Sequence, residues 1–269
     1  MHVKWNLALT MLWLLILYLA GIHIFTTGFL LRRMEMINKS HCNHDFQFNT
    51  DMKNRYHIKD PMACIPAQYH RAIFVVIDAL RFDFVNYDDT LNHQSFYKNK
   101  LKILHEMMTT RANQSRLYRF MADPPTTTMQ RIKGLTTGSL PTFVDAGSNF
   151  ESSQITEDNF IHQSRKINKT MVFMGDDTWE GLYPNVFNRS HPYPSFNVKD
   201  LHTVDNGVLH HLMPELHDGD WDILIAHFLG VDHCGHTYGP NHQEMTNKLI
   251  QMDQILRFAI TVDNSSTCC

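Results

Sequence analysis

The sequence carries little charge and has no segment in which basic residues gather. Charged residues make up 19% of its 269 residues, and the formal net charge is only −3. A nucleic-acid-binding protein normally shows a basic stripe or basic residues interleaved with aromatic ones, and neither pattern occurs here. We therefore expect no nucleic-acid partner. Hydrophobic residues at 43% are enough for a packed core, which argues against a disordered chain.

Cysteines are few, and their arrangement matches neither a zinc motif nor a disulfide framework. The five cysteines include no Cys-x-x-Cys pair, and an odd number is not typical of a disulfide-stapled domain. Cys42 and Cys64 could pair in an oxidising compartment. Spacing alone does not fix their geometry, so this pairing stays open.

A long apolar run occurs only near the N-terminus. Residues 5–31 contain no Asp, Glu, Lys or Arg, and a helix of about 20 such residues crosses a bilayer core. A cleaved signal peptide is the alternative, but its apolar region would span roughly 7–15 residues and end in small side chains. This run is longer and ends in Phe29-Leu30-Leu31. We therefore expect residues 1–34 to form an uncleaved membrane anchor.

The orientation of this anchor is ambiguous from charge alone. Arg32 and Arg33 follow the helix and only Lys4 precedes it, which by the positive-inside rule favours a cytosolic body. Glycosylation sequons favour the opposite side, because they are modified in the secretory lumen. Together with the family resemblance given below, they lead us to expect a lumenal body. The candidate acceptors are Asn38, Asn113, Asn168, Asn188 and Asn264.

Three short apolar runs are each followed by acidic residues. The runs are 72–77, 170–174 and 222–229, and the acids after them are Asp78, Asp176 with Asp177, and Asp232. Continuous apolar runs of this length are typical of strands buried on both faces. Helical stretches are expected at 101–108, 129–135, 158–166, 205–216 and 243–258. This alternation predicts an α/β fold with a mostly parallel sheet, whose ligands bind beyond the carboxyl ends of its strands.

The segment from Asp232 to His236 is the strongest candidate metal motif. It places a carboxylate and an imidazole four residues apart, and Gly230, Gly235 and Gly239 would permit tight turns around them. Carboxylate and neutral imidazole are common zinc ligands. The 18 histidines of the chain raise the expectation of a metal enzyme. An ordinary polar turn is the alternative.

Three threonines, 126–128, follow Pro124-Pro125 at an expected helix start. The positive end of a helix favours anions such as phosphate, and a threonine hydroxyl becomes a nucleophile when a metal lowers its pKa. An ordinary helix N-cap is the competing interpretation. Asp78, at the end of the first apolar run, could bind a second metal, and two metals about 4 Å apart would clamp a phosphoryl displacement.

Asp78, Thr128 and the Asp232–His236 pair occur in an order that resembles the alkaline-phosphatase superfamily. The surrounding segments IDALRFDF, DPPTTTMQR, FMGDDTW and AHFLGVDHCGH are most similar to its phosphodiesterase and phosphoethanolamine-transferase branches. The resemblance extends from the N-terminal helix to about Asp253. It implies an alkaline-phosphatase-like sheet flanked by helices and preceded by one transmembrane helix.

The resemblance also implies roles for single residues. Asp78 and Thr128 match ligands of one zinc, and Asp232 and His236 match ligands of a second. Thr128 matches the nucleophile, in preference to the two threonines before it. Four further residues match positions expected to bind substrate, namely Asn149, Asp176, Asp177 and Trp179.

The family's chemistry implies substrates and a location. Its threonine takes phosphoethanolamine from phosphatidylethanolamine and passes it to a mannose of a glycosylphosphatidylinositol precursor. These lipid substrates imply an enzyme of the endoplasmic reticulum membrane with a lumenal catalytic part, and they leave a partner subunit open. Two alternatives stay open as well: a metal-dependent nucleotide pyrophosphatase or phosphodiesterase, and a non-catalytic lumenal binding module.

The sequence departs from the family pattern after Asp253. The later Asp-His-Gly motif and the later histidine of the family do not occur, so both zinc sites are expected to be incomplete. Each zinc normally has three or four protein ligands. We accordingly expect a linker at 35–70, an incomplete catalytic domain at 71–253 and a divergent tail at 254–269. On this interpretation the chain has weak or no transferase activity.

Overall fold

The computed structural model describes residues 2–29, 38–40, 69–91, 95–122, 124, 126–140 and 154–266. Cys42, Cys64 and Asn149 lie outside these residues. Helix α1 (His2–Phe29) contains one stretch, Leu7–Gly28, that is long and apolar enough to cross a membrane. None of that stretch is buried against the rest of the protein, as expected for a helix whose apolar side chains face lipid.

The body of the protein is built on a four-stranded, wholly parallel sheet. Its strands are β1 (Ala72–Ile77), β2 (Met171–Asp176), β3 (Arg189–Tyr193) and β4 (Ile223–Phe228), in the order β1-β4-β2-β3. The predicted α/β class and all three predicted strands are confirmed. β3 was not predicted, because its sequence RSHPY is polar and contains a proline, features typical of an edge strand.

Besides α1, five helices of the body were predicted; four have ends within two residues of the prediction, and α10 extends eight residues further than expected. They are α4 (Lys102–Thr110), α5 (Thr128–Thr137), α6 (Phe160–Lys166), α8 (Thr203–Asp218) and α10 (Gln243–Ser266). Two short helices, α3 (Phe82–Val85) and α7 (Thr178–Leu182), were not predicted. Neither was α9 (Gly230–Thr237): the expectation of tight turns there was wrong, and Asp232 and His236 lie one turn apart on a helix.

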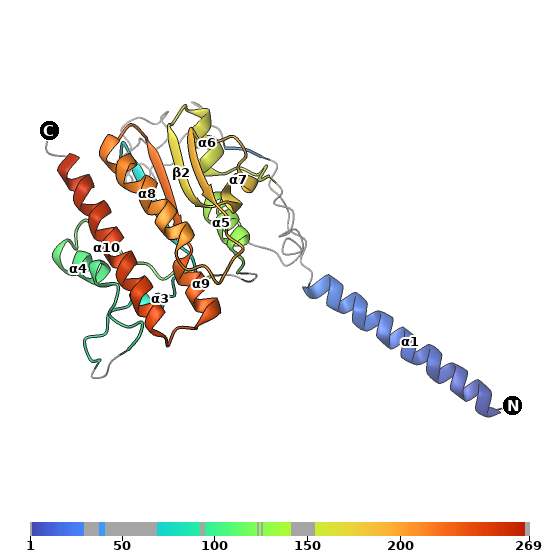
Figure 1. The fold of residues 1–269 in the computed structure, drawn as a ribbon. Helices are drawn as coiled ribbons and strands as arrows, with labels where there is room; N and C mark the ends of the chain where they lie inside the picture. The colour runs from blue at the N-terminus through green and yellow to red at the C-terminus, as the bar shows by residue number, and fades with distance from the viewer. Residues whose placement is uncertain are drawn as a thin grey trace, which may run out of the picture.

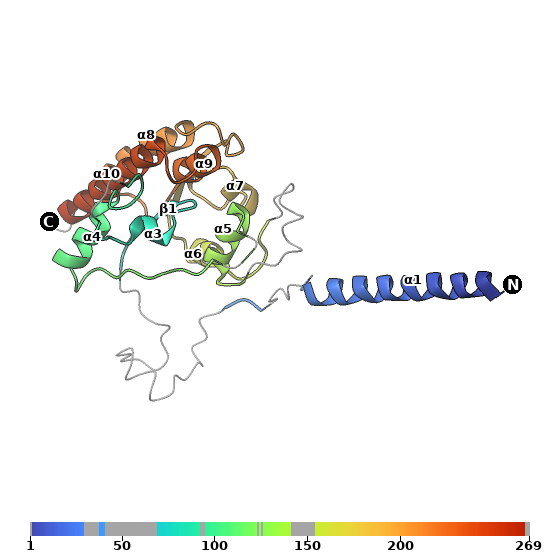
Figure 2. The same ribbon diagram turned by 90° about the horizontal axis from the view of Figure 1, so that it is seen from below.

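Helices cover both faces of the sheet, which gives three layers. Figures 1 and 2 show α8 and α10 on one face and α5, α6 and α7 on the other. The side chains of β2 alternate between these layers: Val172 and Met174 pack with the α8 and α10 residues, whereas Met171 and Phe173 pack with α5, α6 and α7. All four are fully buried, so the hydrophobic effect stabilises both layers against the same strand.

Helix α10 continues well beyond Asp253. Ile255 and Ala259 are buried in the same cluster as the α8 side chains.

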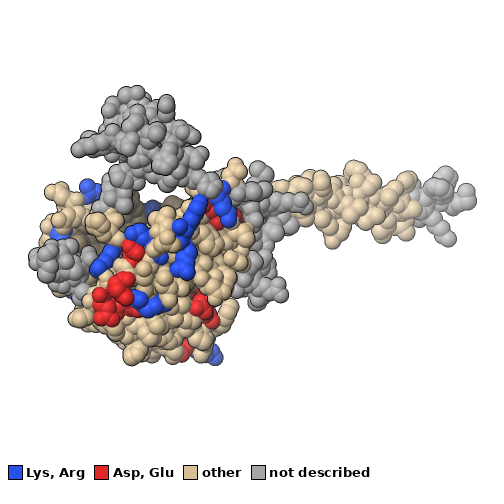
Figure 3. All heavy atoms as spheres, turned by 90° about the horizontal axis from the view of Figure 1, so that it is seen from above, with Lys and Arg blue, Asp and Glu red and all other residues tan. Residues whose placement is uncertain are grey.

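The face shown in Figure 3 carries Lys and Arg side chains interspersed with Asp and Glu. Charges mixed in this way do not create a field of one sign over that face.

Candidate active site

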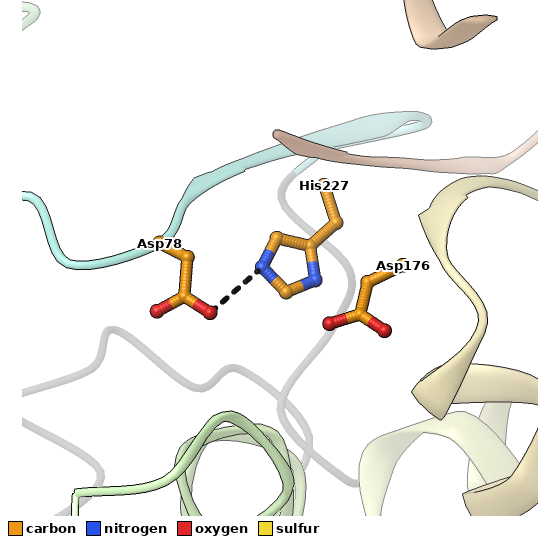
Figure 4. Close-up of side chains that lie close together, drawn as sticks. All are labelled: Asp78, Asp176 and His227. Atoms are coloured by element: carbon orange, nitrogen blue, oxygen red, sulfur yellow. Dashed lines mark ion pairs between the residues drawn. The ribbon is translucent and has the colours of Figure 1, made fainter. Parts of the chain in front are cut away.

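The carboxyl ends of three neighbouring strands bring Asp78, Asp176 and His227 together. Asp78 follows β1, Asp176 ends β2, and His227 lies near the end of β4 between those two strands. One ligand atom from each lies within 4.8 Å of the others. Figure 4 shows the His227 ring between the two carboxylates. Asp176 and His227 are each only 1% exposed, so these polar groups converge in a region largely shielded from water.

Thr128 is the first residue of α5, and its hydroxyl is directed at this group. Its Oγ1 donates a hydrogen bond to Asp78 Oδ2 at 2.8 Å. The other carboxylate oxygen of Asp78 accepts from the Ala79 backbone N–H at 2.8 Å. Ala79 has a φ of 53°, a conformation that is uncommon for a residue with a side chain. Thr127, at the N-cap position, makes no capping hydrogen bond through its side chain.

Asp232 and His236 approach the same region from α9. His236 Nε2 lies 3.6 Å from Asp232 Oδ1. Burial raises the pKa of Asp232, and the negative charge of Asp78 raises it further. A carboxylate in this setting gains from a neighbouring cation.

A buried ion pair fixes the start of α9. Asp205 of α8 accepts hydrogen bonds from the backbone N–H groups of Leu229 and Gly230, both at 3.0 Å. The other oxygen of Asp205 lies 3.0 Å from Lys248 Nζ of α10, and both side chains are at most 1% exposed. Asp205 thus caps the positive end of α9, where a negative charge is stabilising. It thereby fixes the start of the helix that carries Asp232 and His236.

A cleft of about 470 Å³ opens in front of these groups. Its lining includes Thr128, Asp176, Asp232 and His236. Of the four residues predicted to converge, Thr128, Asp232 and His236 therefore line one cleft, and Asp78 is hydrogen-bonded to Thr128 at its wall. The cleft also has an apolar rim, where Phe196 is 83% exposed.

The residues expected to bind substrate occupy different positions. Asp176 and Asp177 line the cleft, and Asp177 accepts a hydrogen bond from Ser195 Oγ at 2.8 Å. Trp179 is buried behind the cleft, where it donates from Nε1 to His227 Nδ1 at 3.0 Å. Asn149 lies outside the described residues. The binding roles of all four stay predictions.

The candidate glycosylation sites lie on the surface where they are described. Asn38, Asn113, Asn168 and Asn188 are exposed. The backbone of Asn264 is in α10, and its side chain is outside the described part. Asn188 accepts a hydrogen bond through Oδ1 from the Met171 backbone N–H at 2.9 Å. This bond does not use Nδ2, the atom to which a glycan would be attached.

Three residues of the site were missed from the sequence. His227 could have been noticed as a titratable side chain inside an apolar strand, immediately before the Asp232–His236 motif. Asp205 and Lys248 had no local signal, because they are 43 residues apart and meet only when α8 and α10 pack on the same face of the sheet.

The donor set fits a divalent cation. Asp78 and Asp176 supply carboxylate oxygens within 4.8 Å of each other, and hard divalent cations and zinc both accept such ligands. A cation would also relieve the repulsion between Asp78 and Asp232 that raises the pKa of Asp232. Residues that could hold metal are therefore Asp78, Asp176 and Thr128 on one side and Asp232 with His236 on the other.

Comparisons with known proteins give a consistent result. Residues 93–260 match the family model described as type I phosphodiesterase / nucleotide pyrophosphatase. The chain is 48% identical over 261 residues to GPI ethanolamine phosphate transferase 3, catalytic subunit, of Mus musculus, an alignment that covers 94% of this chain and 24% of that protein. The Homo sapiens protein of the same name is 47% identical, with the same coverage.

A fungal relative is similarly close. GPI ethanolamine phosphate transferase 3 of Saccharomyces cerevisiae is 45% identical over 246 residues, covering 90% of this chain and 22% of the relative. The chain therefore spans about a quarter of the length of the curated relatives it matches. No solved structure matches it significantly.

Proposed function

Because the chain belongs to the type I phosphodiesterase and nucleotide pyrophosphatase family, we propose that it carries the catalytic site of a phosphoethanolamine transferase with Thr128 as nucleophile. The observation that carries this proposal is the hydrogen bond from Thr128 Oγ1 to Asp78 Oδ2, at the wall of a cleft that also contains Asp176, Asp232 and His236. The similarity to GPI ethanolamine phosphate transferases of mammals and fungi supports the choice of transferred group.

In the proposed reaction Thr128 Oγ attacks the phosphorus of phosphatidylethanolamine. The bond from phosphorus to the diacylglycerol oxygen breaks, and Asp78 Oδ2 takes the hydroxyl proton and passes it to that oxygen, so that diacylglycerol leaves as an alcohol. A mannose hydroxyl of a glycosylphosphatidylinositol precursor then attacks the phosphorus of the phosphoethanolamine on Thr128, the bond from phosphorus to Thr128 Oγ breaks, and the mannose proton passes through Asp78 to Thr128 Oγ. Zinc, bound by the two residue sets named above, would lower the pKa of the threonine hydroxyl and offset charge on the phosphoryl oxygens.

The substrates and location follow from this proposal. Both substrates are lipids, so the apolar helix α1 would hold the cleft at a membrane, that of the endoplasmic reticulum, with the body in the lumen. The mammalian relatives are named catalytic subunits, which supports a partner subunit for this chain as well.

Replacing Thr128 by Ala tests the nucleophile. Both zinc sites are expected to be incomplete, so any labelling should be slow: in zinc-containing nanodiscs of phosphatidylethanolamine, the full chain should slowly acquire phosphoethanolamine on the peptide that contains Thr128, detected by mass spectrometry. Thr128→Ala should reduce the labelling rate by roughly 10⁴-fold or more, as loss of a catalytic nucleophile does. Thr126→Ala is the matched control, because this exposed neighbour should leave labelling unchanged. Labelling of Thr126, or of the Thr128→Ala chain at the original rate, would refute the assignment.

The same preparation distinguishes the other candidate functions. The family description favours hydrolysis of nucleotide pyrophosphates or phosphodiesters as the second candidate. Rapid hydrolysis of a nucleotide ester without phosphoethanolamine labelling would establish that activity instead. A non-catalytic lumenal module would bind phosphatidylethanolamine equally well before and after Thr128→Ala and would show neither reaction.

Glycosylation tests the proposed lumenal orientation. Asn113 and Asn168 are exposed sequon residues in separate parts of the body. When the chain is expressed in a eukaryotic cell, endoglycosidase H should lower its apparent mass, and Asn113→Gln and Asn168→Gln should each remove one glycan. Asn206→Gln, an exposed asparagine outside any sequon, is the control. A chain that carries no glycan at any of its sequons would contradict a lumenal body.

A further inference from the structure

We propose that Trp179 holds His227 in the tautomer with its proton on Nε2, so that His227 presents a hydrogen-bond donor to the Asp78–Thr128 pair and is not a ligand of a metal bound there. His227 belongs by distance to the group that could hold a metal. Its hydrogen bonding assigns it a different role. A role of this N–H group in phosphoryl transfer rests on the proposed function, whereas the assignment of the tautomer does not.

The tautomer follows from the chemistry of the indole. Trp179 Nε1 lies 3.0 Å from His227 Nδ1, and an indole nitrogen can only donate. His227 Nδ1 must therefore accept, through its lone pair. A neutral imidazole whose Nδ1 accepts carries its proton on Nε2, and an imidazolium ion would place two N–H groups against each other.

This arrangement removes the ring from the metal's set of ligands. An imidazole binds a metal through the lone pair of an unprotonated nitrogen. In His227 the lone pair of Nδ1 is used by Trp179, and Nε2 carries the proton. Histidines that bind metals usually have the opposite arrangement, in which the second nitrogen donates to a carboxylate, carbonyl or water.

Packing prevents Trp179 from giving up this contact. Its side chain is 2% exposed, and its ring centroid lies 5.6 Å from that of Phe173, 6.1 Å from that of Tyr183 and 6.4 Å from that of Phe187. The Trp179 and His227 rings meet edge to face at 83°. An indole enclosed on several sides cannot rotate without disturbing a close-packed core.

The protonated nitrogen is directed at the nucleophile's partner. His227 Nε2 lies 3.7 Å from Asp78 Oδ2, the oxygen that also accepts from Thr128. Among the described residues this nitrogen is buried and makes no hydrogen bond. An unsatisfied buried donor costs about 1–3 kcal/mol, so a small approach of Asp78, or of a phosphoryl oxygen beside it, would be favourable. His227 is in this sense a positioning residue that acts through Asp78.

The test reads the ring nitrogens of His227 directly. The full chain is labelled with ¹⁵N-histidine in nanodiscs, and the His227 signals are assigned by their loss in His227→Gln. We expect the proton on Nε2 and none on Nδ1, before and after addition of zinc. Trp179→Phe should allow a proton on Nδ1, whereas Tyr183→Phe, which removes a hydroxyl from the same cluster, should change nothing. A proton on Nδ1 in the unaltered chain, or a zinc-shifted Nε2, would overturn the proposal.

Zinc affinity provides a second readout that needs no transferase activity. Gln places an amide N–H near the position of Nε2, so His227→Gln should keep the affinity within about threefold, less than the roughly 10–100-fold typical of losing a residue that orients a ligand. Asp78→Asn is the positive control and should lower the affinity by at least that larger factor. Equal losses in the two variants would show that His227 binds the metal. Failure of phosphoethanolamine labelling would leave both readouts intact.

Discussion

Lys248→Met should destabilise the protein by about 3–5 kcal/mol, the usual cost of removing one partner of a buried ion pair. Lys248 Nζ lies 3.0 Å from Asp205 Oδ2, and neither side chain is more than 1% exposed. Methionine has a similar length but no charge, so Asp205 would keep a buried carboxylate with no cation beside it. Urea unfolding of the full chain, followed by tryptophan fluorescence, measures the change.

Lys169→Met is the matched control. Lys169 Nζ lies 2.7 Å from Asp222 Oδ1, but the two side chains are 40% and 31% exposed. A pair in contact with water contributes about 0–1 kcal/mol, so this variant should unfold almost like the original. The double variant Asp205→Asn/Lys248→Met should recover part of the lost stability, since Asn can still accept from the α9 backbone. Equal effects of the two lysine substitutions would contradict a buried, charged clamp.

The sequence allowed strands β1, β2 and β4 and the acids at their carboxyl ends to be predicted. Their apolar runs predicted burial on both faces, which holds for β2 and β4, whereas β1 lies at the edge of the sheet and is partly exposed. Each run leads into an acid at the same edge of the sheet. The pairing of Thr128 with Asp78 was implied by the resemblance to the alkaline-phosphatase superfamily, and the structure has them in a hydrogen bond at 2.8 Å.

What escaped prediction depends on long-range contacts. Helix α9 contains Gly230 and Gly235, and glycine is about 1 kcal/mol less favourable than alanine in a helix. Local propensity therefore favoured turns. The helix forms because Asp205 caps it from α8, and a residue that far away leaves no signal in the local pattern.

His227 shows a different limit. Residue type alone does not distinguish His227 from the other histidines among the 18 in the chain. Which of its ring nitrogens carries the proton is determined only by the position of Trp179. The spacing of a sequence can predict that residues able to bind metal lie at one edge of a sheet. The direction of a hydrogen bond between them depends on side-chain packing, which the spacing does not predict. The metal-like group of Asp78, Asp176 and His227 is therefore a set of two carboxylates and one donor.

Gly175→Ala should have the other large effect, because β2 and β4 approach too closely there for any side chain. Gly175 has a φ of +132°, and an added Cβ would lie 2.2 Å from the His227 carbonyl oxygen and 2.9 Å from its Cβ. Backbone strain of about 1–3 kcal/mol adds to about 1–3 kcal/mol for overpacking. The strands would have to separate beside Asp176 and His227, so zinc affinity should fall together with stability.

Gly138→Ala separates these two causes. Gly138 also has a positive φ, +70°, but an added Cβ would meet nothing within 4 Å. This variant should lose only the roughly 1–2 kcal/mol of a left-handed residue with a side chain and should bind zinc normally. If Gly175→Ala unfolded at the same urea concentration as Gly138→Ala, the strands would not be in close contact at His227. If it were less stable but bound zinc unchanged, this contact would not position the site.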